Sequence, residues 1–173
     1  GQIKGLWLIA TNPMTSMTNT ARIRKTLEKL EFLVVQDAYA DVESNEYAHV
    51  YLPAAIWAEK EGCFTNTERR VNLIRNALPP YAESKPDLWI FNELAKRFEQ
   101  GRKLKFPQTA EGVFQELREL SKGRMLDYSG MTYEKIEQQR GIQWPCTDGA
   151  EHGTERLYTD GKFQYPDGKA KLI

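Results

Sequence analysis

The fold of this chain is decided by residues 5–35, in which two apolar runs, GLWLIA at 5–10 and FLVV at 32–35, flank a charged segment. Each run has the length of a strand and contains no polar residue, as in strands buried on both faces of a parallel sheet. Between the runs, Asn19 or Thr20 can cap a helix that continues to about Leu30, with its apolar residues on one face. Strand, helix and strand in about 30 residues predict a right-handed βαβ unit.

The pattern extends along the chain to a third strand and to further helices. The third strand is expected at His49–Leu52, where Pro53 ends it. Helical spacing of apolar residues predicts further helices at residues 85–98, 109–122 and 133–140. After Gly141, strand-like and turn-like signals alternate among Gly, Pro, Thr and Asp, so we expect an extended linker with a hairpin.

The composition is that of a folded chain without a charge surplus. Its 173 residues include 24 Lys and Arg against 24 Asp and Glu, which disfavours a general nucleic-acid binder or a polybasic membrane-surface segment. Hydrophobic residues at 40% supply a core. We expect no membrane-spanning segment, because no apolar run approaches ~20 residues, and we find no signal peptide. We also expect a piece of a longer protein, since the chain starts at Gly1 rather than Met and stops at Ile173 inside an apolar stretch.

Polar residues follow the first two predicted strands. Asn12 lies in a Thr-Asn-Pro turn after the first strand, and Gln36 and Asp37 follow the second. Ligands bind outside the carboxyl ends of parallel strands, although Asn and Asp at such positions also simply form turns. The chain has no Gly-x-Gly-x-x-Gly motif and no phosphate-binding loop. A carboxylate such as Asp37 can instead accept hydrogen bonds from a ribose or from the two adjacent donors of guanine.

Other reactive residue types favour structural interpretations. The two cysteines, Cys63 and Cys146, are too few for a zinc or iron–sulfur site of their own. The two histidines lie far apart in the sequence and have no ligand-like spacing. Lys60 belongs to a short charged cluster, which by itself indicates a solvated turn. Arg69 and Arg70 are expected to pair with acidic groups of the fold.

Several motifs nevertheless occur together and in a characteristic order. They are the Thr-Asn-Pro turn at 11–13 followed by Ser16, LVVQD at 33–37, VYLPAA at 50–55, WAEKEG at 57–62, FTNTERR at 64–70, KPDLW at 85–89, GIQWP at 141–145 and GTERLY at 153–158. In this order they resemble the molybdopterin oxidoreductases, the bis(molybdopterin guanine dinucleotide) enzymes of the dimethyl sulfoxide reductase class. The resemblance covers nearly the whole chain, and it is strongest to assimilatory nitrate reductases, especially the cyanobacterial ferredoxin-dependent type.

The resemblance implies a fold and a division of the chain. The fold class would be α/β, a dinucleotide-binding-like three-layer parallel sheet with helices on both faces, followed by an irregular C-terminal linker with a hairpin. Residues 1–100 would be part of the domain that binds molybdopterin guanine dinucleotide. Residues 101–173 would be a helical extension and a linker toward a C-terminal barrel domain.

The resemblance also implies roles for five residues. Asn12 would contact the cofactor, and Gln36 and Asp37 would recognise its nucleoside end. Lys60 would neutralise a phosphate or hold the cofactor by hydrogen bonds, and Asp87 would hydrogen-bond the guanine. These residue types agree with the chemistry, because carboxylates accept from guanine and ribose while an ammonium pairs with pyrophosphate.

The expected parent enzyme would reduce nitrate to nitrite in nitrate assimilation, by a two-electron reaction in the cytoplasm. Its molybdenum ligand and its [4Fe–4S] cluster would lie outside this segment, so no catalytic or metal-binding residue is assigned and the segment alone is expected to be inactive. Its partners would be the remaining domains of the parent chain and an electron donor such as ferredoxin. Two alternatives stay open: the same domain of a formate dehydrogenase, and a degenerate interaction domain that binds no cofactor.

Overall fold

The computed structural model describes residues 2–172, and these form two compact units that each combine two separate stretches of chain. Unit 1 consists of Gly1–Lys60 and Asn76–Arg102, and unit 2 consists of Glu61–Arg75 and Lys103–Ile173. The expected division into a part of the cofactor-binding domain, residues 1–100, and an extension with a linker, residues 101–173, stays a prediction. The boundary near residue 100 does fall where the chain enters unit 2 for the second time, but residues 61–75 also belong to unit 2.

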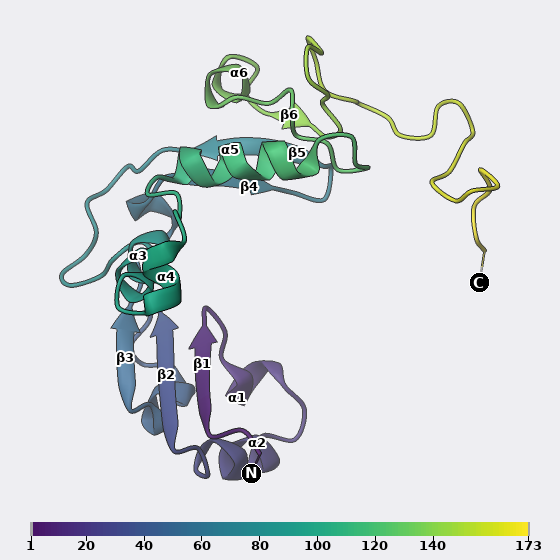
Figure 1. Ribbon diagram of the computed structural model, residues 1–173. Helices are drawn as coiled ribbons and strands as arrows, with labels where there is room; N and C mark the ends of the chain where they lie inside the picture. The colour runs from purple at the N-terminus through teal and green to yellow at the C-terminus, as the bar shows by residue number, and fades with distance from the viewer. Residues whose placement is uncertain (1, 173) are drawn as a thin grey trace. The chain divides into compact units, whose positions relative to one another are not determined.

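A parallel sheet is the centre of unit 1. Its strands are β1 (Gly5–Ile9), β2 (Phe32–Asp37) and β3 (Val50–Pro53), and they pair in the order β1-β2-β3 (Figure 1). The register places Leu8 of β1 opposite Val35 of β2. The parallel pairing confirms the βαβ unit that the two apolar runs predict.

Helices α1 (Pro13–Ser16) and α2 (Thr20–Leu27) connect β1 to β2. Asn19 caps α2, and its side chain accepts a hydrogen bond from the backbone of Arg22 at 3.1 Å. One face of the sheet packs against these helices in a single buried apolar cluster. The cluster contains Leu8, Met14, Leu27, Leu33 and Val35. Leu27 is the last residue of α2, so the helix ends three residues before the predicted Leu30.

Helix α3 (Asp87–Ala95) provides a layer on the other face of the sheet. The ring of Phe91 meets the ring of Trp7 edge to face, with 5.5 Å between the ring centroids. Because neighbouring residues of a strand point to opposite faces, Trp7 packs away from the cluster that contains Leu8. Helices α1 and α2 therefore pack on one face of the sheet, and α3 contacts the other face through Phe91. The shorter helices η1 (Glu43–Tyr47), η2 (Trp57–Glu59) and α4 (Glu99–Lys103) lie in the connections.

Unit 2 contains a second sheet, which the sequence does not predict. It is antiparallel, with β4 (Gly62–Thr65), β5 (Arg70–Ile74) and β6 (Ile142–Gln143) in the order β4-β5-β6. Helices α5 (Ala110–Ser121) and α6 (Tyr133–Gln138) confirm two of the predicted helices. The core of the unit consists of Val71, Phe114, Tyr128, Met131, Tyr133, Ile136, Ile142 and Cys146.

The C-terminal segment is irregular, as expected, but its hairpin is replaced by separate turns. No strand forms among the described residues 154–172. The backbone N–H of Gly168 donates to the carbonyl of Tyr165 at 2.8 Å, and Phe163 donates to the carbonyl of Gly168 at 2.9 Å. Strands need a continuous ladder and a buried face, and most side chains of this segment are exposed.

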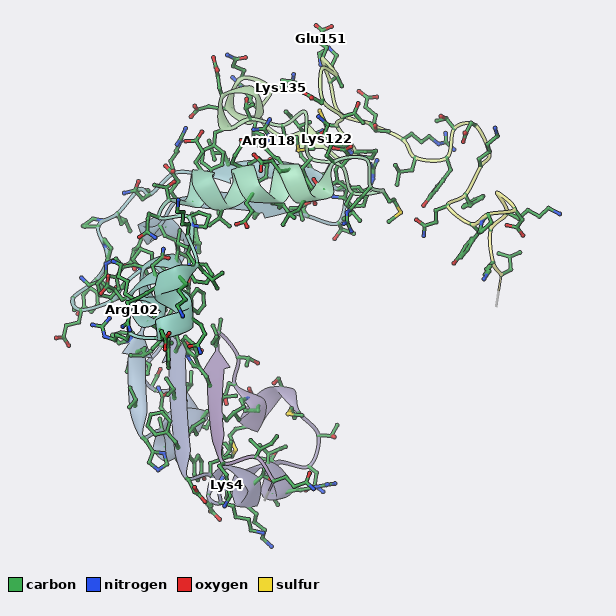
Figure 2. All side chains as sticks on the ribbon, in the orientation of Figure 1. Lys4, Arg102, Arg118, Lys122, Lys135 and Glu151 are labelled. Carbon is green, nitrogen blue, oxygen red and sulfur yellow. The ribbon has the colours of Figure 1, made fainter. Side chains whose placement is uncertain are left out.

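Among the described residues, no helix combines the length and the apolar character that crossing a membrane requires. In unit 2, Lys135 of α6, which Figure 2 labels, lies partly buried, and its ammonium donates to the carbonyl of Gly130 at 3.2 Å. The same ammonium also donates to the carbonyl of Ala150, so it connects the loop before α6 with the loop that follows β6.

Candidate functional site

Three of the five predicted site residues meet in one hydrogen-bonded group at the carboxyl edge of the parallel sheet. Gln36 lies near the end of β2, Lys60 follows η2 and Asp87 opens α3. The Gln36 amide donates from Nε2 to Oδ1 of Asp87 at 2.7 Å. The Lys60 ammonium forms an ion pair with Oδ2 of the same carboxylate. We call Gln36, Lys60 and Asp87 the Asp87 cluster.

Backbone pairing beside β3 brings Asp87 to this edge. Lys85 forms a parallel bridge with Ala54, and its N–H donates to the carbonyl of Pro53 at 3.1 Å. Its carbonyl in turn accepts from Ala55 at 2.9 Å. Pro86 then occupies the cap position of α3 and Asp87 the first turn. A carboxylate in the first turn is favourable, because the free N–H groups of a helix N-terminus carry partial positive charge.

A buried carboxylate shapes the turn that presents Lys60. Glu59 is 8% exposed and was not singled out from the sequence. Its Oε2 accepts from the backbone of Ile56 at 3.1 Å, and its Oε1 accepts from the backbone of Tyr81 at 3.2 Å. These bonds satisfy both oxygens of the buried group, so Glu59 joins η2 to the segment before α3. The sequence gives only a weak signal of this role of Glu59, because the cap position of η2 holds Ile56 instead of a polar residue.

The Asp87 cluster combines burial with access. The Lys60 side chain is 34% exposed and the Asp87 side chain 27% exposed, whereas Gln36 is fully buried. Burial favours a raised pKa for Asp87, but the hydrogen bonds from Lys60 and Gln36 outweigh it and lower the pKa below its ordinary value. Asp87 is therefore ionised at neutral pH and presents a partly exposed carboxylate.

Asn12 lies at the end of β1 in a different set of hydrogen bonds. Its Oδ1 accepts from the backbone of Met14 at 3.2 Å, which caps α1, and from the hydroxyl of Ser44 at 2.7 Å. Its Nδ2 donates to the carboxylate of Glu43. Backbone hydrogen bonding at Glu43 and this bond from Asn12 lower the pKa of Glu43. Asn12 thus links the first strand end to η1, and the sequence had not indicated Ser44.

Asp37 forms the turn after β2. Its Oδ1 accepts from the backbone of Tyr39 at 3.0 Å, which is the geometry of an Asx turn. Its carbonyl accepts from the hydroxyl of Tyr51 at 2.9 Å and from the backbone of Ala54 at 3.0 Å. Asp37 is half-buried and neighbours Gln36 in sequence. The strand ends themselves are joined, because Ala10 donates to the carbonyl of Gln36 at 2.9 Å.

The two cysteines and His49 have structural surroundings. Burial raises the pKa of the Cys63 thiol to about 11, and Cys146 is buried in the core of unit 2. His49 accepts a hydrogen bond at Nδ1 from the backbone of Leu33 at 3.0 Å. Within residues 2–172, no group of three or more His, Cys, Asp or Glu side chains could hold a metal ion.

The two adjacent arginines of unit 2 are structural, although their main partners are not the expected acidic groups. Arg69 donates to the carbonyl of Glu155 at 2.8 Å and also to that of Trp144. Arg70 donates to the carbonyl of Gly141 at 3.0 Å. Its contact with the carboxylate of Glu68 is longer, at 3.8 Å. Both guanidinium groups therefore hold the chain on either side of β6, and Glu155 beyond it, against β5 through backbone carbonyls.

The comparisons with known proteins define the class. The model of the molybdopterin oxidoreductase family matches residues 1–97 of the chain. The chain belongs to this family. A nitrate reductase of Synechocystis sp. and the assimilatory nitrate reductase catalytic subunit of Bacillus subtilis are each 41% identical to it, over 99% of this chain and 24% of their own length. A formate dehydrogenase alpha subunit of Methanocaldococcus jannaschii shows the same identity and coverage.

A solved structure confirms the fold at lower sequence similarity. Acetylene hydratase from Pelobacter acetylenicus matches 96% of this chain and 21% of its own, with a TM-score of 0.64 and 19% sequence identity. The chain spans about a quarter of the length of the curated nitrate reductases and formate dehydrogenase that it matches.

Proposed function

We propose that this chain is part of the cofactor-binding domain of a molybdenum-dependent assimilatory nitrate reductase, and that it holds the guanine end of a molybdopterin guanine dinucleotide. The observation that carries the proposal is the Asp87 cluster at the carboxyl edge of the sheet. Edges of this kind are where open α/β sheets bind nucleotides. The 41% identity to two nitrate reductases supports the choice of enzyme.

The chemistry of the Asp87 cluster fits a guanine nucleotide. Guanine presents N1–H and its 2-amino group as two adjacent donors, and an ionised carboxylate offers two acceptor oxygens side by side. Gln36 and Lys60 donate to different oxygens of Asp87, and the carboxylate, with about four lone-pair sites, keeps acceptor capacity for a ligand. Lys60 has three donor hydrogens, of which the ion pair with Asp87 uses one, so its ammonium can also pair with a phosphate oxygen.

Asn12 and Asp37 would extend this site along the same edge. Asn12 would contact the cofactor from the end of β1, and Asp37 would bind the ribose from the turn after β2. The bond from Ala10 to the carbonyl of Gln36 supports this arrangement, because it keeps the two strand ends adjacent. Lys60 would balance the negative charge of the pyrophosphate.

When bound, the molybdenum cofactor would supply the oxygen-atom transfer chemistry for the two-electron reduction of nitrate. The residues of this chain bind and orient it. The molybdenum ligand and an iron–sulfur cluster would come from other parts of the parent protein, which would work in the cytoplasm with ferredoxin or a similar electron donor. This segment alone would reduce no nitrate.

A formate dehydrogenase is the second candidate, because such an alpha subunit is also 41% identical to the chain. The full-length protein separates the two when it is assayed with nitrate plus a reduced viologen dye and, separately, with formate plus the oxidised dye. Nitrate reduction alone supports the proposal, and formate oxidation alone replaces it. The degenerate interaction domain is disfavoured, because the carboxylate, the amide and the ammonium of the site are all present and connected.

Metal analysis tests the cofactor assignment first. We expect one molybdenum per polypeptide and about four irons in the purified full-length protein, as one [4Fe–4S] cluster requires. Folded, homogeneous protein without molybdenum would withdraw the cofactor roles of Asn12, Gln36, Asp37, Lys60 and Asp87.

Replacement of Asp87 tests the guanine contact itself. Asp87→Asn in the full-length protein keeps the shape of the side chain but exchanges one acceptor for a donor that faces the donors of guanine. We expect at least tenfold weaker retention of the cofactor, because one hydrogen bond to a charged group contributes about 1.5–3 kcal/mol. Retention is measured as GMP released by acid hydrolysis per polypeptide. Glu28→Gln, an equivalent change at an exposed position beside α2, is the control and should leave retention unchanged.

A further inference from the structure

Gln36 differs from the other residues of the Asp87 cluster in its burial. It is 0% exposed, whereas the side chain of Asp87 is 27% exposed. A nucleotide that approaches the edge of the sheet can therefore reach the carboxylate but not the amide. The burial of Gln36 favours an indirect role over the direct recognition of the nucleoside that the resemblance implies.

The orientation of the Gln36 amide follows from its partner. An ionised carboxylate only accepts hydrogen bonds, so the NH₂ group of the amide must face Asp87. The other end of the amide, Oε1, is then buried, and it has no hydrogen-bond partner among the described residues. Buried polar atoms without partners are uncommon, and they concentrate where function constrains the structure.

We propose that Gln36 is a positioning residue, which does not touch the cofactor but holds the Asp87 carboxylate in the orientation that binds guanine. This inference rests on the proposed function. Two donors hydrogen-bond to the carboxylate: Gln36 to Oδ1 and Lys60 to Oδ2. Lys60 is a flexible and partly exposed cation, whereas Gln36 is fixed by complete burial within β2. Rotation of the carboxylate is thus restricted mainly from the side of the sheet.

The test is a double-substitution cycle in the full-length protein. Gln36→Met keeps the length of the side chain and removes both the donor and the unpaired acceptor. It is combined with Asp87→Asn, and the rate at which each purified variant loses GMP and molybdenum during dialysis is measured. We expect Gln36→Met to speed the loss about tenfold when Asp87 is present, and to have no further effect beside Asn at position 87.

Two additional readouts separate positioning from a structural role. The thermal midpoint of Gln36→Met should fall only a little, because the lost hydrogen bond to Asp87 is partly offset by the removal of a buried acceptor that lacks a partner. As the pH is lowered, this variant should lose its cofactor at a higher pH than the unsubstituted protein does, since Asp87 lacks a donor that favours its ionised form. Gln36→Leu serves as a second variant if the methionine side chain does not pack.

Each contrary result has a distinct meaning. If Gln36→Met speeds the loss of GMP and molybdenum equally with Asp and with Asn at position 87, Gln36 acts independently of Asp87. That result would overturn this inference while leaving the guanine contact in place. Unchanged retention in Asp87→Asn would overturn the guanine contact and with it the role of Gln36. A large fall in thermal midpoint for both Gln36 variants, with an unchanged pH profile, would make Gln36 a structural residue only.

Discussion

At the scale of single residues, the carboxylate of Asp87 is held by donors that lie far away in the sequence. Gln36 precedes it by 51 positions and Lys60 by 27. The kinds of residue could be inferred from the sequence, since a carboxylate, an amide and an ammonium suit a guanine nucleotide. Their mutual contact could not, because no local pattern specifies which side chains of distant segments meet.

The ion pair of Asp87 predicts a particular dependence of stability on pH. Because its folded-state pKa is lowered, its contribution is fully present above the unfolded pKa of about 3.9 and is lost as the pH falls through the folded pKa. We therefore expect the stability lost by Asp87→Asn to be largest near neutral pH and to shrink as the pH falls below about 4. The measurement is the urea midpoint of this chain and its variant over that range.

The matched control for this prediction is again Glu28→Gln, whose exposed side chain is not part of the Asp87 cluster and should change the midpoint little at any pH. If the difference between the unsubstituted chain and Asp87→Asn stayed constant from neutral to acid pH, the ionised form of Asp87 would not be the one that the fold stabilises.

At the scale of elements, local signals specified the helices better than the strands of unit 2. Helices α2, α5 and α6 begin beside Asn19, Thr109 and Thr132, each of which caps its helix through a side-chain oxygen. A cap and the apolar spacing after it lie within a few residues, so they can be recognised in the sequence. Strands β4 and β5 are short and carry polar residues, and β5 also depends on β6, about 70 residues later.

The apolar face predicted for α5 is only partly used within the chain. Phe114 is buried in the core of unit 2, whereas Val113, Leu117 and Leu120 are 42%, 43% and 64% exposed. Helical spacing shows which residues share a face, but it does not show what covers that face.

Loss of the α5 cap should have a measurable effect. The Thr109 hydroxyl accepts from the backbone of Gly112 at 3.1 Å. Thr109→Ala should lower the free energy of unfolding by about 1 kcal/mol, because the backbone N–H of Gly112 in the first turn of the helix loses its hydrogen-bond acceptor. Thr109→Ser should restore most of the stability, and Thr159→Ala in the exposed C-terminal segment is a suitable control. Equal midpoints for Thr109→Ala and the unsubstituted chain in urea unfolding would show that the cap contributes nothing.

At the scale of the whole molecule, the chain enters unit 2 twice. Glu61–Arg75 supplies β4 and β5, and the remainder of unit 2 begins at Lys103. Val71 from the first stretch is 2% exposed and belongs to the same apolar core as Phe114 and Ile136 from the second. A boundary drawn once along the sequence therefore separates residues that share a core.

This arrangement predicts how fragments behave. A fragment of residues 103–173 lacks β4, β5 and the buried Val71, so we expect it to show no cooperative thermal unfolding. Residues 61–75 joined to 103–173 through a flexible glycine–serine linker should regain a cooperative transition, because the sheet and the core are complete again. Circular dichroism during heating measures both. A cooperative transition in the shorter fragment would mean that its core does not need β5.

The sequence by itself determined the parallel βαβ unit, the positions of most helices, and the membership of the family. These features depend on short-range apolar periodicity, on caps and on motifs in order, which are local properties of the chain. Only the tertiary structure decided that Gln36, Lys60 and Asp87 form one cluster while Asn12 and Asp37 make separate bonds, and that residues 61–75 complete a second core. The physical reason is that contacts between distant segments are selected by the packing of the whole fold, which no single stretch of sequence encodes.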